Sequence, residues 1–260
     1  MMPVISEEEW EAFGQLCTIL RPFEEMTTEM SGEKYVTGGN VIVATRILKD
    51  TCEELYKMDN ILPQITAFIG ELDKYIDERF DKVEKSGSFS LCTFLDPRFK
   101  MAAFKDQSEA AKTKRRVQDK VQEMIARQRQ EVPAEPFAPS NKKTLSAWDV
   151  FDKFMSDKIT SQQGTPLSKA IKEVQMYAED DILLRVDSEG NKNCPRKWWA
   201  AHRHIYPNLA HIYRTNCNIV ASSVPCERLF SKTGLIISDR RSSLKSDKVR
   251  QLMFLNVNLD

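Results

Sequence analysis

The sequence predicts a mainly α-helical chain, and two features of its pattern support this prediction. In most segments apolar residues recur three and four positions apart, which places them along one face of a helix. Signals for helix starts precede several of these segments: Ser6 and Glu9 form a capping box, and Pro63 and Pro207 stand where a first helical turn accepts proline. Neither an internal repeat nor a phosphate-binding glycine loop interrupts the pattern.

The composition narrows the class of protein. Of the 260 residues, 41% are hydrophobic and 29% are charged, so the chain can bury a core and is not disordered by composition. Lysine plus arginine and aspartate plus glutamate are balanced at 38 each, so the chain as a whole has no electrostatic attraction to nucleic acid. No apolar run approaches the roughly 20 residues that span a bilayer, and the first residues lack the features of a signal peptide. We therefore expect an intracellular protein in a reducing compartment, without a membrane partner.

The six cysteines are widely spaced and form no CxxC pair, which argues against a zinc finger. All three histidines lie between Cys194 and Cys217, so a Cys/His metal site is the alternative interpretation of this segment. The spacing matches no zinc-binding pattern. We expect buried thiols and surface histidines, with no metal and no cofactor.

The first 85 or so residues predict three helices. The first helix begins at the capping box, and the third begins at Pro63. Each has an apolar stripe at helical spacing. The stripe of the first helix comprises Trp10, Phe13, Leu16, Cys17, Leu20 and Phe23. The stripe of the third comprises Ile65, Phe68, Leu72, Tyr75, Ile76, Phe80 and Val83.

Residues 86–104 have a different character. Ser-Gly-Ser indicates a turn, and the following FSLCTFL is short, apolar and β-leaning. We expect a buried extended segment or a loop packed on the helices. Arg98 then pairs either with Asp96 or with the C-terminal end of a helix.

Residues 105–130 predict a charged helix. Between Arg98 and Arg129 there are ten lysines and arginines against four aspartates and glutamates. A basic helix face can follow nucleic-acid phosphates, but a solvated face is the more common use of such a pattern. The residues that we expect to contact nucleic acid, if any do, are Lys112, Lys114, Arg115 and Arg116, together with Arg240 and Arg241 near the C-terminus.

The next segment, EVPAEPFAPSNKKTLS, holds three prolines and no periodicity, which indicates a linker. The expected organisation is a helical domain over residues 1–135, a proline-rich linker over 136–146 and a C-terminal region over 147–260. Helical spacing resumes at Trp148, and a further helix follows within TPLSKAIKEVQMYA.

From Trp198 onward the sequence is dense in large apolar residues. Short helices cannot hide all of this area by themselves, so a further surface, within the chain or on a second copy, has to cover it. We expect dimer contacts or core positions at Trp198, Trp199, Tyr206, Leu209, Leu229, Phe230, Leu252, Phe254 and Leu255.

Six motifs follow one another in the C-terminal region, and they define its core motif, residues 196–260. They are WW at 198–199, YPNLA at 206–210, ASS at 221–223, ERLFSKTGLI at 227–236, RRSSL at 240–244 and VRQLMFLNVNL at 249–259. In order and spacing they resemble the C-terminal region of hAT-superfamily transposases and of the ZBED-like, BED-finger proteins derived from them. Upstream, residues 6–27 and the FLDPRFK motif at 94–100 resemble the middle region of the same family.

The resemblance implies an N-terminal BED zinc finger and an RNase-H-like catalytic fold that a helical insertion divides. It also implies a catalytic triad of two aspartates and a glutamate, in which Glu227 has the position of the glutamate. Two-metal phosphoryl transfer needs carboxylates from separate elements, and both aspartates should precede Ser6. We therefore expect Glu227 to be vestigial, either paired with Arg228, Arg240 or Arg241 or capping a helix.

The resemblance thus predicts a non-enzymatic, nuclear interaction module. Residues 1–135 correspond to the hAT insertion, and 147–260 to the dimerisation region, with the closing helices of an incomplete RNase-H-like fold. The expected partner is a second copy or a related hAT-derived protein, with DNA bound only weakly and without specificity, and with no small-molecule substrate. The alternatives are a DNA-binding fragment and part of a DDE-type transposase whose N-terminal half is missing.

Overall fold

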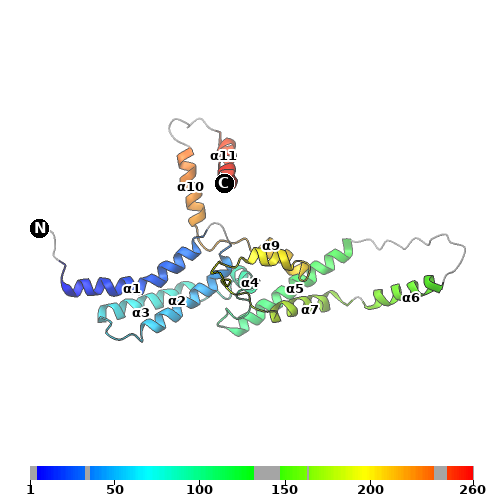
Figure 1. Ribbon diagram of the computed structural model, residues 1–260, viewed down its shortest axis with the longest axis horizontal. Helices are drawn as coiled ribbons and strands as arrows, with labels where there is room; N and C mark the ends of the chain where they lie inside the picture. Colours follow the sequence, from blue (N-terminus) through cyan, green and yellow to red (C-terminus); the bar gives the residue numbers. More distant parts are fainter. Residues whose placement is uncertain (1–4, 33–35, 132–146, 163, 237–244, 260) are drawn as a thin grey trace. The chain divides into compact units, whose positions relative to one another are not determined.

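A computed structural model describes residues 5–32, 36–131, 147–162, 164–236 and 245–259 (Figure 1). These residues are mainly helical, which confirms the predicted class; the β-structure described among them is one isolated bridge between Val186 and Lys192. Within the described ranges no helix is both long and apolar enough to cross a membrane.

The chain folds into two compact units. The first combines Met1–Val83 with Asn218–Asp260, and the second is Glu84–Cys217. The predicted linker at 136–146 falls inside the second stretch and outside the described residues. The predicted division into 1–135 and 147–260 therefore stays a prediction, and each unit is described below by itself.

Three long helices form the core of the first unit: α1 (Glu7–Met30), α2 (Val41–Leu55) and α3 (Pro63–Phe80). The capping box is present, because the Ser6 hydroxyl accepts from the Glu9 N–H and the Glu9 carboxylate accepts from the Ser6 N–H. The buried core of these helices comprises Ile19, Cys52, Leu55, Ile65, Ile69 and Ile76.

The predicted stripe of α1 is only partly correct. Leu16 and Phe23 pack against the core, but Trp10, Phe13 and Leu20 are exposed. The apolar positions of α1 form two adjacent lines, and periodicity alone does not indicate which line faces the neighbouring helices.

Two further helices complete the first unit, α10 (Val224–Ile236) and α11 (Ser246–Asn258), and they contact each other. The segment before α10 is hydrogen-bonded to the short helix η1 (Gly38–Asn40) and to Thr37, the residue that precedes it. The Gly38 N–H donates to the Ile219 carbonyl at 2.8 Å, and the Thr37 hydroxyl accepts from the Ala221 N–H at 2.8 Å. A Cβ at Gly38 would lie 2.8 Å from the Ile219 oxygen, so this contact requires glycine.

The second unit contains α4 (Gly87–Phe94), α5 (Gln107–Glu131), α6 (Ala147–Gln162), α7 (Pro166–Glu179), α8 (Pro195–His202) and α9 (Pro207–Asn216). Helix α5 packs along α7, and α9 packs on α4, α5 and α8. The proline at the first turn of α7, α8 and α9 suits a position whose N–H has no partner within the helix.

The expectation of an extended segment or a loop after residue 86 was wrong, because these residues form α4. The Ser86 hydroxyl accepts from the Phe89 N–H and caps the helix, and Ser90–Phe94 are all buried. A short apolar run that is buried on every side has the same pattern in a helix as in a strand.

Candidate functional site

The residues predicted for dimer contacts or core positions separate into two groups in the structure. Trp198, Trp199, Tyr206 and Leu209 lie on or beside α8 and α9 in the second unit. The others lie on α10 and α11 in the first unit: Leu229, Phe230, Leu252, Phe254 and Leu255.

The first group surrounds Tyr177 of α7 in an aromatic core. Trp199, Tyr206 and Leu209 are buried, and the rings of Tyr177 and Trp199 lie 5.1 Å apart. The Trp199 indole N–H donates to the Leu95 carbonyl at 2.8 Å, and the Tyr177 hydroxyl donates to the Phe94 carbonyl at 3.1 Å. Burial raises the pKa of Tyr177 well above its ordinary range. This group packs the interior of the second unit.

The buried amine of Lys100 holds the C-terminal end of α7. Its Nζ donates to the carbonyls of Tyr177 at 2.8 Å, Asp180 at 2.7 Å and Asp181 at 3.1 Å. The same ammonium lies 4.7 Å from the centre of the Tyr177 ring. Burial lowers the pKa of Lys100, and the backbone reaches this position with a left-handed φ of 48°.

Next to Lys100, Arg98 pairs with Asp96, which confirms one of the two pairings expected from the sequence. The guanidinium and carboxylate approach to 2.7 Å, and both side chains are almost fully buried. The Arg98 N–H and Nε–H also donate to Asp96 Oδ1, at 3.0 and 2.9 Å. The FLDPRFK motif therefore folds into a structural turn in which both charges have partners.

Two carboxylates of the α7 region fix the start of α9. Glu173 Oε1 accepts from the N–H groups of Asn208 and Leu209, each at 2.9 Å. The Tyr206 hydroxyl donates to Asp180 Oδ2 at 3.0 Å. Burial, followed by this hydrogen bond, raises the pKa of Tyr206 to about 12.

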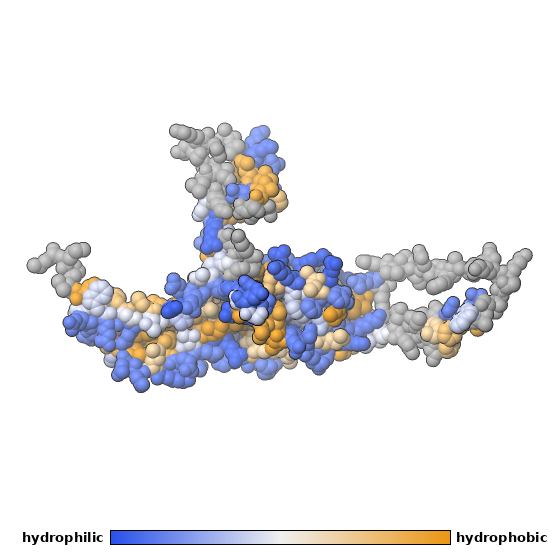
Figure 2. All heavy atoms as spheres, viewed as in Figure 1, coloured by the Kyte–Doolittle hydropathy of each residue, from blue (hydrophilic) through white to orange (hydrophobic). Residues whose placement is uncertain are grey.

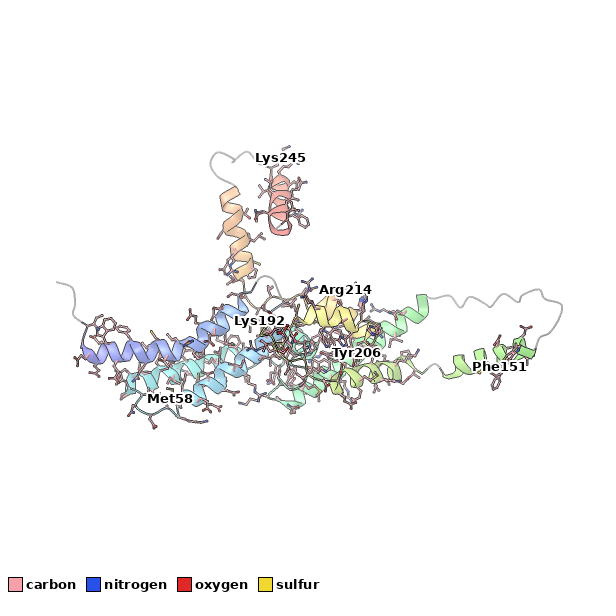
Figure 3. All side chains as sticks on the ribbon, in the orientation of Figure 1. Met58, Phe151, Lys192, Tyr206, Arg214 and Lys245 are labelled. Atoms are coloured by element: carbon pink, nitrogen blue, oxygen red, sulfur yellow. The ribbon has the colours of Figure 1, made fainter. Side chains whose placement is uncertain are left out.

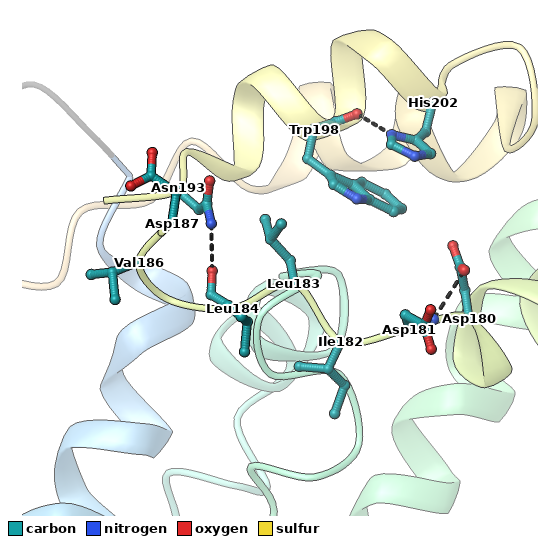
Figure 4. Close-up of a pocket in the computed structure, with 10 residues that line it drawn as sticks. All are labelled: Asp180, Asp181, Ile182, Leu183, Leu184, Val186, Asp187, Asn193, Trp198 and His202. Atoms are coloured by element: carbon teal, nitrogen blue, oxygen red, sulfur yellow. Dashed lines mark hydrogen bonds between the residues drawn. The ribbon is translucent and has the colours of Figure 1, made fainter. Parts of the chain in front are cut away.

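A pocket of about 340 Å³ opens beside this region (Figure 4). The Trp198 and His202 rings stack at 4.0 Å on its wall, and the His202 Nδ1 lies 2.8 Å from the Trp198 carbonyl oxygen. The other lining residues are Asp180, Asp181, Ile182, Leu183, Leu184, Val186, Asp187 and Asn193. This lining contains no serine, threonine or cysteine to serve as a nucleophile, and among the described residues no three His, Cys, Asp or Glu side chains gather as metal ligands.

The second group, in contrast, is exposed. Phe230 is 73% exposed and Phe254 is 67% exposed, and Leu229, Leu252 and Leu255 are exposed as well. On α11 the buried residues Val249 and Met253 occupy one face, and three apolar residues are exposed outside that face, Leu252, Phe254 and Leu255. Figure 2 shows hydrophobic residues gathered on α11. The α10–α11 pair thus presents apolar side chains to solvent.

Glu227 lies in the first turn of α10. Its carboxylate accepts a hydrogen bond from the Ser223 hydroxyl, and its N–H donates to the Ser223 carbonyl at 3.0 Å. The Arg228 guanidinium donates to the Ser31 carbonyl at 3.4 Å. Of the two local roles expected for Glu227, its contacts with Ser223 fit the helix-start role, while Arg240 and Arg241 lie outside the described residues.

The basic residues predicted on α5 have mixed surroundings. Lys112 pairs with Glu109 at 2.8 Å, and Lys114 donates to Gln175. Arg115 is exposed and Arg116 is half-buried. Their contact with nucleic acid stays a prediction.

The site residues that the sequence did not reveal are Lys100, Glu173 and Tyr177. Of these three, only Lys100 belongs to a motif that was identified from the sequence, since it is the last residue of FLDPRFK. Its three carbonyl partners lie as many as 81 positions away in the sequence.

Comparison with known proteins gives the following matches. Residues 173–259 match the hAT family C-terminal dimerisation region. The chain is 26% identical over 261 residues to the human zinc finger BED domain-containing protein 4, covering 98% of this chain and 21% of that protein. It is 25% identical over 261 residues to the zinc finger BED domain-containing protein DAYSLEEPER of Arabidopsis thaliana, covering 95% of this chain and 34% of that protein.

A third relative is the putative AC transposase of Zea mays, 25% identical over 258 residues, with 95% of this chain and 30% of that protein covered. The chain therefore spans about a fifth to a third of the length of these curated relatives.

Proposed function

Because this chain is related to hAT transposases and ZBED-like proteins and carries the hAT dimerisation region, we propose that it is a self-association module whose contact surface is the α10–α11 pair. The observation that carries the proposal is the exposure of Phe230 and Phe254 on two helices of that region. The expected partner is a second copy of the chain, or a related hAT-derived protein.

Physical chemistry supports the α10–α11 surface over the aromatic core of the second unit. Burying an aromatic or leucine side chain that was exposed stabilises a complex by about 1.5–3 kcal/mol. Trp199, Tyr206 and Leu209 are already buried inside their own unit, so a partner would bury little more of their surface. Phe230 and Phe254 are still exposed, so a partner could bury them. Aromatic residues of this kind contribute most of the binding free energy in many interfaces.

A dimer of identical chains would place the same α10–α11 pair on both sides of a two-fold axis. Each pair would then cover the apolar side chains of the other, as two helical hairpins do in a four-helix bundle. This arrangement needs no further element from either chain.

We further propose that the role of the chain is not catalytic and that Glu227 is a vestigial catalytic position. The Ser223 contact of its carboxylate supports a structural role at the start of α10. In this proposal residues 147–260 supply closing helices to an RNase-H-like fold in longer relatives, and the site of action is the nucleus. The names of the relatives, BED zinc-finger proteins and a transposase, support this setting.

Solution mass tests the proposal. Light scattering after size exclusion, over a concentration series, should give twice the 30.0 kDa chain mass for the wild type. The double substitution F230D/F254D should shift the mass to that of one chain, because two buried charges oppose association. Circular dichroism should show unchanged helix content, since both side chains are exposed.

The matched control is F151D/F154D on α6, which introduces the same charges at two other exposed phenylalanines. This variant should keep the mass of the wild type. A wild type that stays monomeric at every concentration contradicts the proposal, and a dimer that survives F230D/F254D places the contact on another surface.

A further inference from the structure

The pocket that Trp198 and His202 line, which we call the Trp198 pocket, has an aromatic wall (Figure 4). The Trp198 indole is half-buried, and the His202 ring stacks on it at 4.0 Å. Because a carbonyl oxygen only accepts, His202 Nδ1 donates in its 2.8 Å hydrogen bond to the Trp198 carbonyl. This bond and the stacking hold both rings against α8, so the wall is formed before any ligand binds.

A second wall of the Trp198 pocket is the segment that follows α7. The helix ends at Asp180 with an extended backbone (φ −61°, ψ 158°), and residues 181–184 continue without helix or strand. Leu183 is half-buried on the side of the aromatic wall, whereas Ile182 and Leu184, 50% and 73% exposed, lie on the other side (Figure 4). Such alternation is typical of an extended chain.

The backbone of this segment is paired on one side. The Leu183 N–H donates to the Pro97 carbonyl at 2.9 Å. In the described part of the chain, the N–H groups of Ile182 and Leu184 have no acceptor. An extended segment with one unpaired side can accept a second strand along that side.

The Trp198 pocket is negatively charged. Asp180, Asp181 and Asp187 line it, and no lysine or arginine does. The ammonium of Lys100 binds the carbonyls of Asp180 and Asp181, so it offsets part of this charge from inside the fold. The lining therefore favours a ligand that carries a positive charge.

The three carboxylates differ in the groups that they already bind. Asp180 accepts from the Tyr206 hydroxyl at 3.0 Å and from the Asp181 N–H at 2.9 Å. Asp187 accepts from the Asn191 N–H at 2.8 Å, within its own turn. The Asp181 side chain is exposed and accepts no hydrogen bond from the described residues. Of the three, Asp181 is thus the carboxylate best placed to pair with a cation of a partner.

We propose that the Trp198 pocket binds an extended peptide segment of a partner protein, in which an apolar side chain stands next to an arginine or lysine. The apolar side chain packs against Trp198 and Leu183, and the cation pairs with Asp181. The carbonyls of the peptide accept from the N–H groups of Ile182 and Leu184. In this mode of recognition, main-chain hydrogen bonds provide affinity and side-chain pockets provide specificity.

The charge and the size of the Trp198 pocket favour this ligand over others. Three carboxylates oppose the approach of nucleic-acid phosphates. A volume of about 340 Å³ is near the lower limit for small-molecule sites, and it suits one apolar side chain. A small amine would leave Ile182 and Leu184 exposed, whereas a peptide covers both and pairs with their N–H groups.

Fluorescence anisotropy on the full chain with a labelled nonapeptide of alternating leucine and arginine tests this inference. The double substitution D181N/L184S should weaken binding about tenfold or more, through the lost ion pair and the lost apolar contact. Both positions are exposed, so circular dichroism should show an unchanged fold. Hydrogen exchange at the Ile182 and Leu184 N–H groups should slow when the peptide binds.

A second peptide, with glutamine in place of arginine, tests the pairing with Asp181. It should bind the wild type more weakly than the arginine peptide does. The single variant Asp181→Asn should bind both peptides with similar affinity, because the interaction of the cation with Asp181 is then absent from both complexes. Equal affinity of the wild type for the two peptides would overturn the inference.

The matched control is M58S/D59N in the first unit, where Met58 is labelled in Figure 3. It changes an exposed apolar residue and an exposed acid that line another pocket, of about 410 Å³. This control should leave the affinity for the arginine peptide unchanged. Equal losses in the two double variants would reduce the effect to non-specific attraction and overturn the inference. So would a wild type that does not bind the peptide, or unchanged hydrogen exchange at Ile182 and Leu184.

The inference does not depend on self-association. The solution mass of D181N/L184S should equal that of the wild type, so a failure of peptide binding and a failure of dimerisation are measured separately.

Discussion

Single residues of the second unit connect segments that lie far apart in the sequence, and the contribution of Tyr206 to stability can be followed by pH. Its phenol is buried and donates to Asp180, and its pKa rises to about 12. An unfolded tyrosine ionises with a pKa near 10, so in this range the folded state holds a proton that the unfolded state loses. The stability that Tyr206 contributes is fully present below pH 10 and is lost between about pH 10 and 12.

We therefore expect the difference in free energy of unfolding between the wild type and Tyr206→Phe to become smaller as pH rises. At pH 8 the variant should be less stable by about 1 kcal/mol, through the lost hydrogen bond to Asp180. By pH 11 the wild type should have lost roughly 1 kcal/mol that the variant does not lose. Urea denaturation at pH 8, 10 and 11 measures both quantities. Tyr75→Phe, at an exposed tyrosine, is the control; a constant difference for Tyr206→Phe across these pH values contradicts the assignment.

At this scale the sequence allowed only some roles to be predicted. The pairing of Arg98 with Asp96 was within reach because the two residues are neighbours in one turn. The role of Lys100 was not, because its amine is directed to the end of α7, 77 to 81 positions away. Such a contact depends on how α7 packs, and no local pattern encodes it.

Among the elements, α9 depends on a carboxylate that belongs to another helix. Asn208 and Leu209 stand in the first turn of α9, where N–H groups have no helical partner, and Glu173 of α7 accepts from both. The negative charge also interacts favourably with the helix dipole. Helices usually obtain such a cap from the residue just before them, but here Tyr206 occupies that position and provides no side-chain cap.

Replacing Glu173 by alanine should therefore destabilise the second unit by about 1–2 kcal/mol, a typical cost of losing a helix cap. Hydrogen exchange should show the loss first at the N–H groups of Asn208 and Leu209. Lys169→Ala, at an exposed position of the same helix, should change stability by less than about 0.5 kcal/mol. Equal effects of the two substitutions would argue that Glu173 contributes through α7 alone.

The elements themselves were largely predictable from periodicity and proline positions, and the errors have clear causes. The segment after residue 86 was expected to be an extended segment or a loop, because its run of apolar residues has no helical period. In the structure Ser90–Phe94 of α4 are all buried, so this part of the helix has no polar face.

For the whole molecule, the sequence and the structure divide the chain in different ways. Proline content marks a linker at 136–146, which separates α5 from α7 along the chain. In the structure α5 packs along α7, so the two sides of the predicted linker share one compact unit. The first unit in turn uses both ends of the chain, joined where Thr37 and Gly38 bind Ala221 and Ile219. Composition reflects the local sequence alone, whereas long-range packing decides which segments fold together.

These two divisions predict different stable fragments. Residues 84–217 contain the aromatic core, the Lys100 contacts and the α5–α7 packing, and they are continuous in the sequence. We expect this fragment to unfold cooperatively on heating, with near-ultraviolet circular dichroism from its buried Tyr177 and Trp199 rings. Fragments 1–135 and 147–260 separate α5 from α7, so each should expose part of the same core and bind a hydrophobic dye.

Fragment 1–83 is the control for the first unit. It retains the α1–α3 core but loses the hydrogen bonds that Thr37 and Gly38 make to residues 219–221, so it should melt at a lower temperature than a single-chain fusion of 1–83 with 218–260. A cooperative transition in 147–260 together with a molten 84–217 would support the division at the prolines. The reverse result would establish that residues 173–259, which match the hAT family C-terminal dimerisation region, are shared between two folding units and do not fold as one.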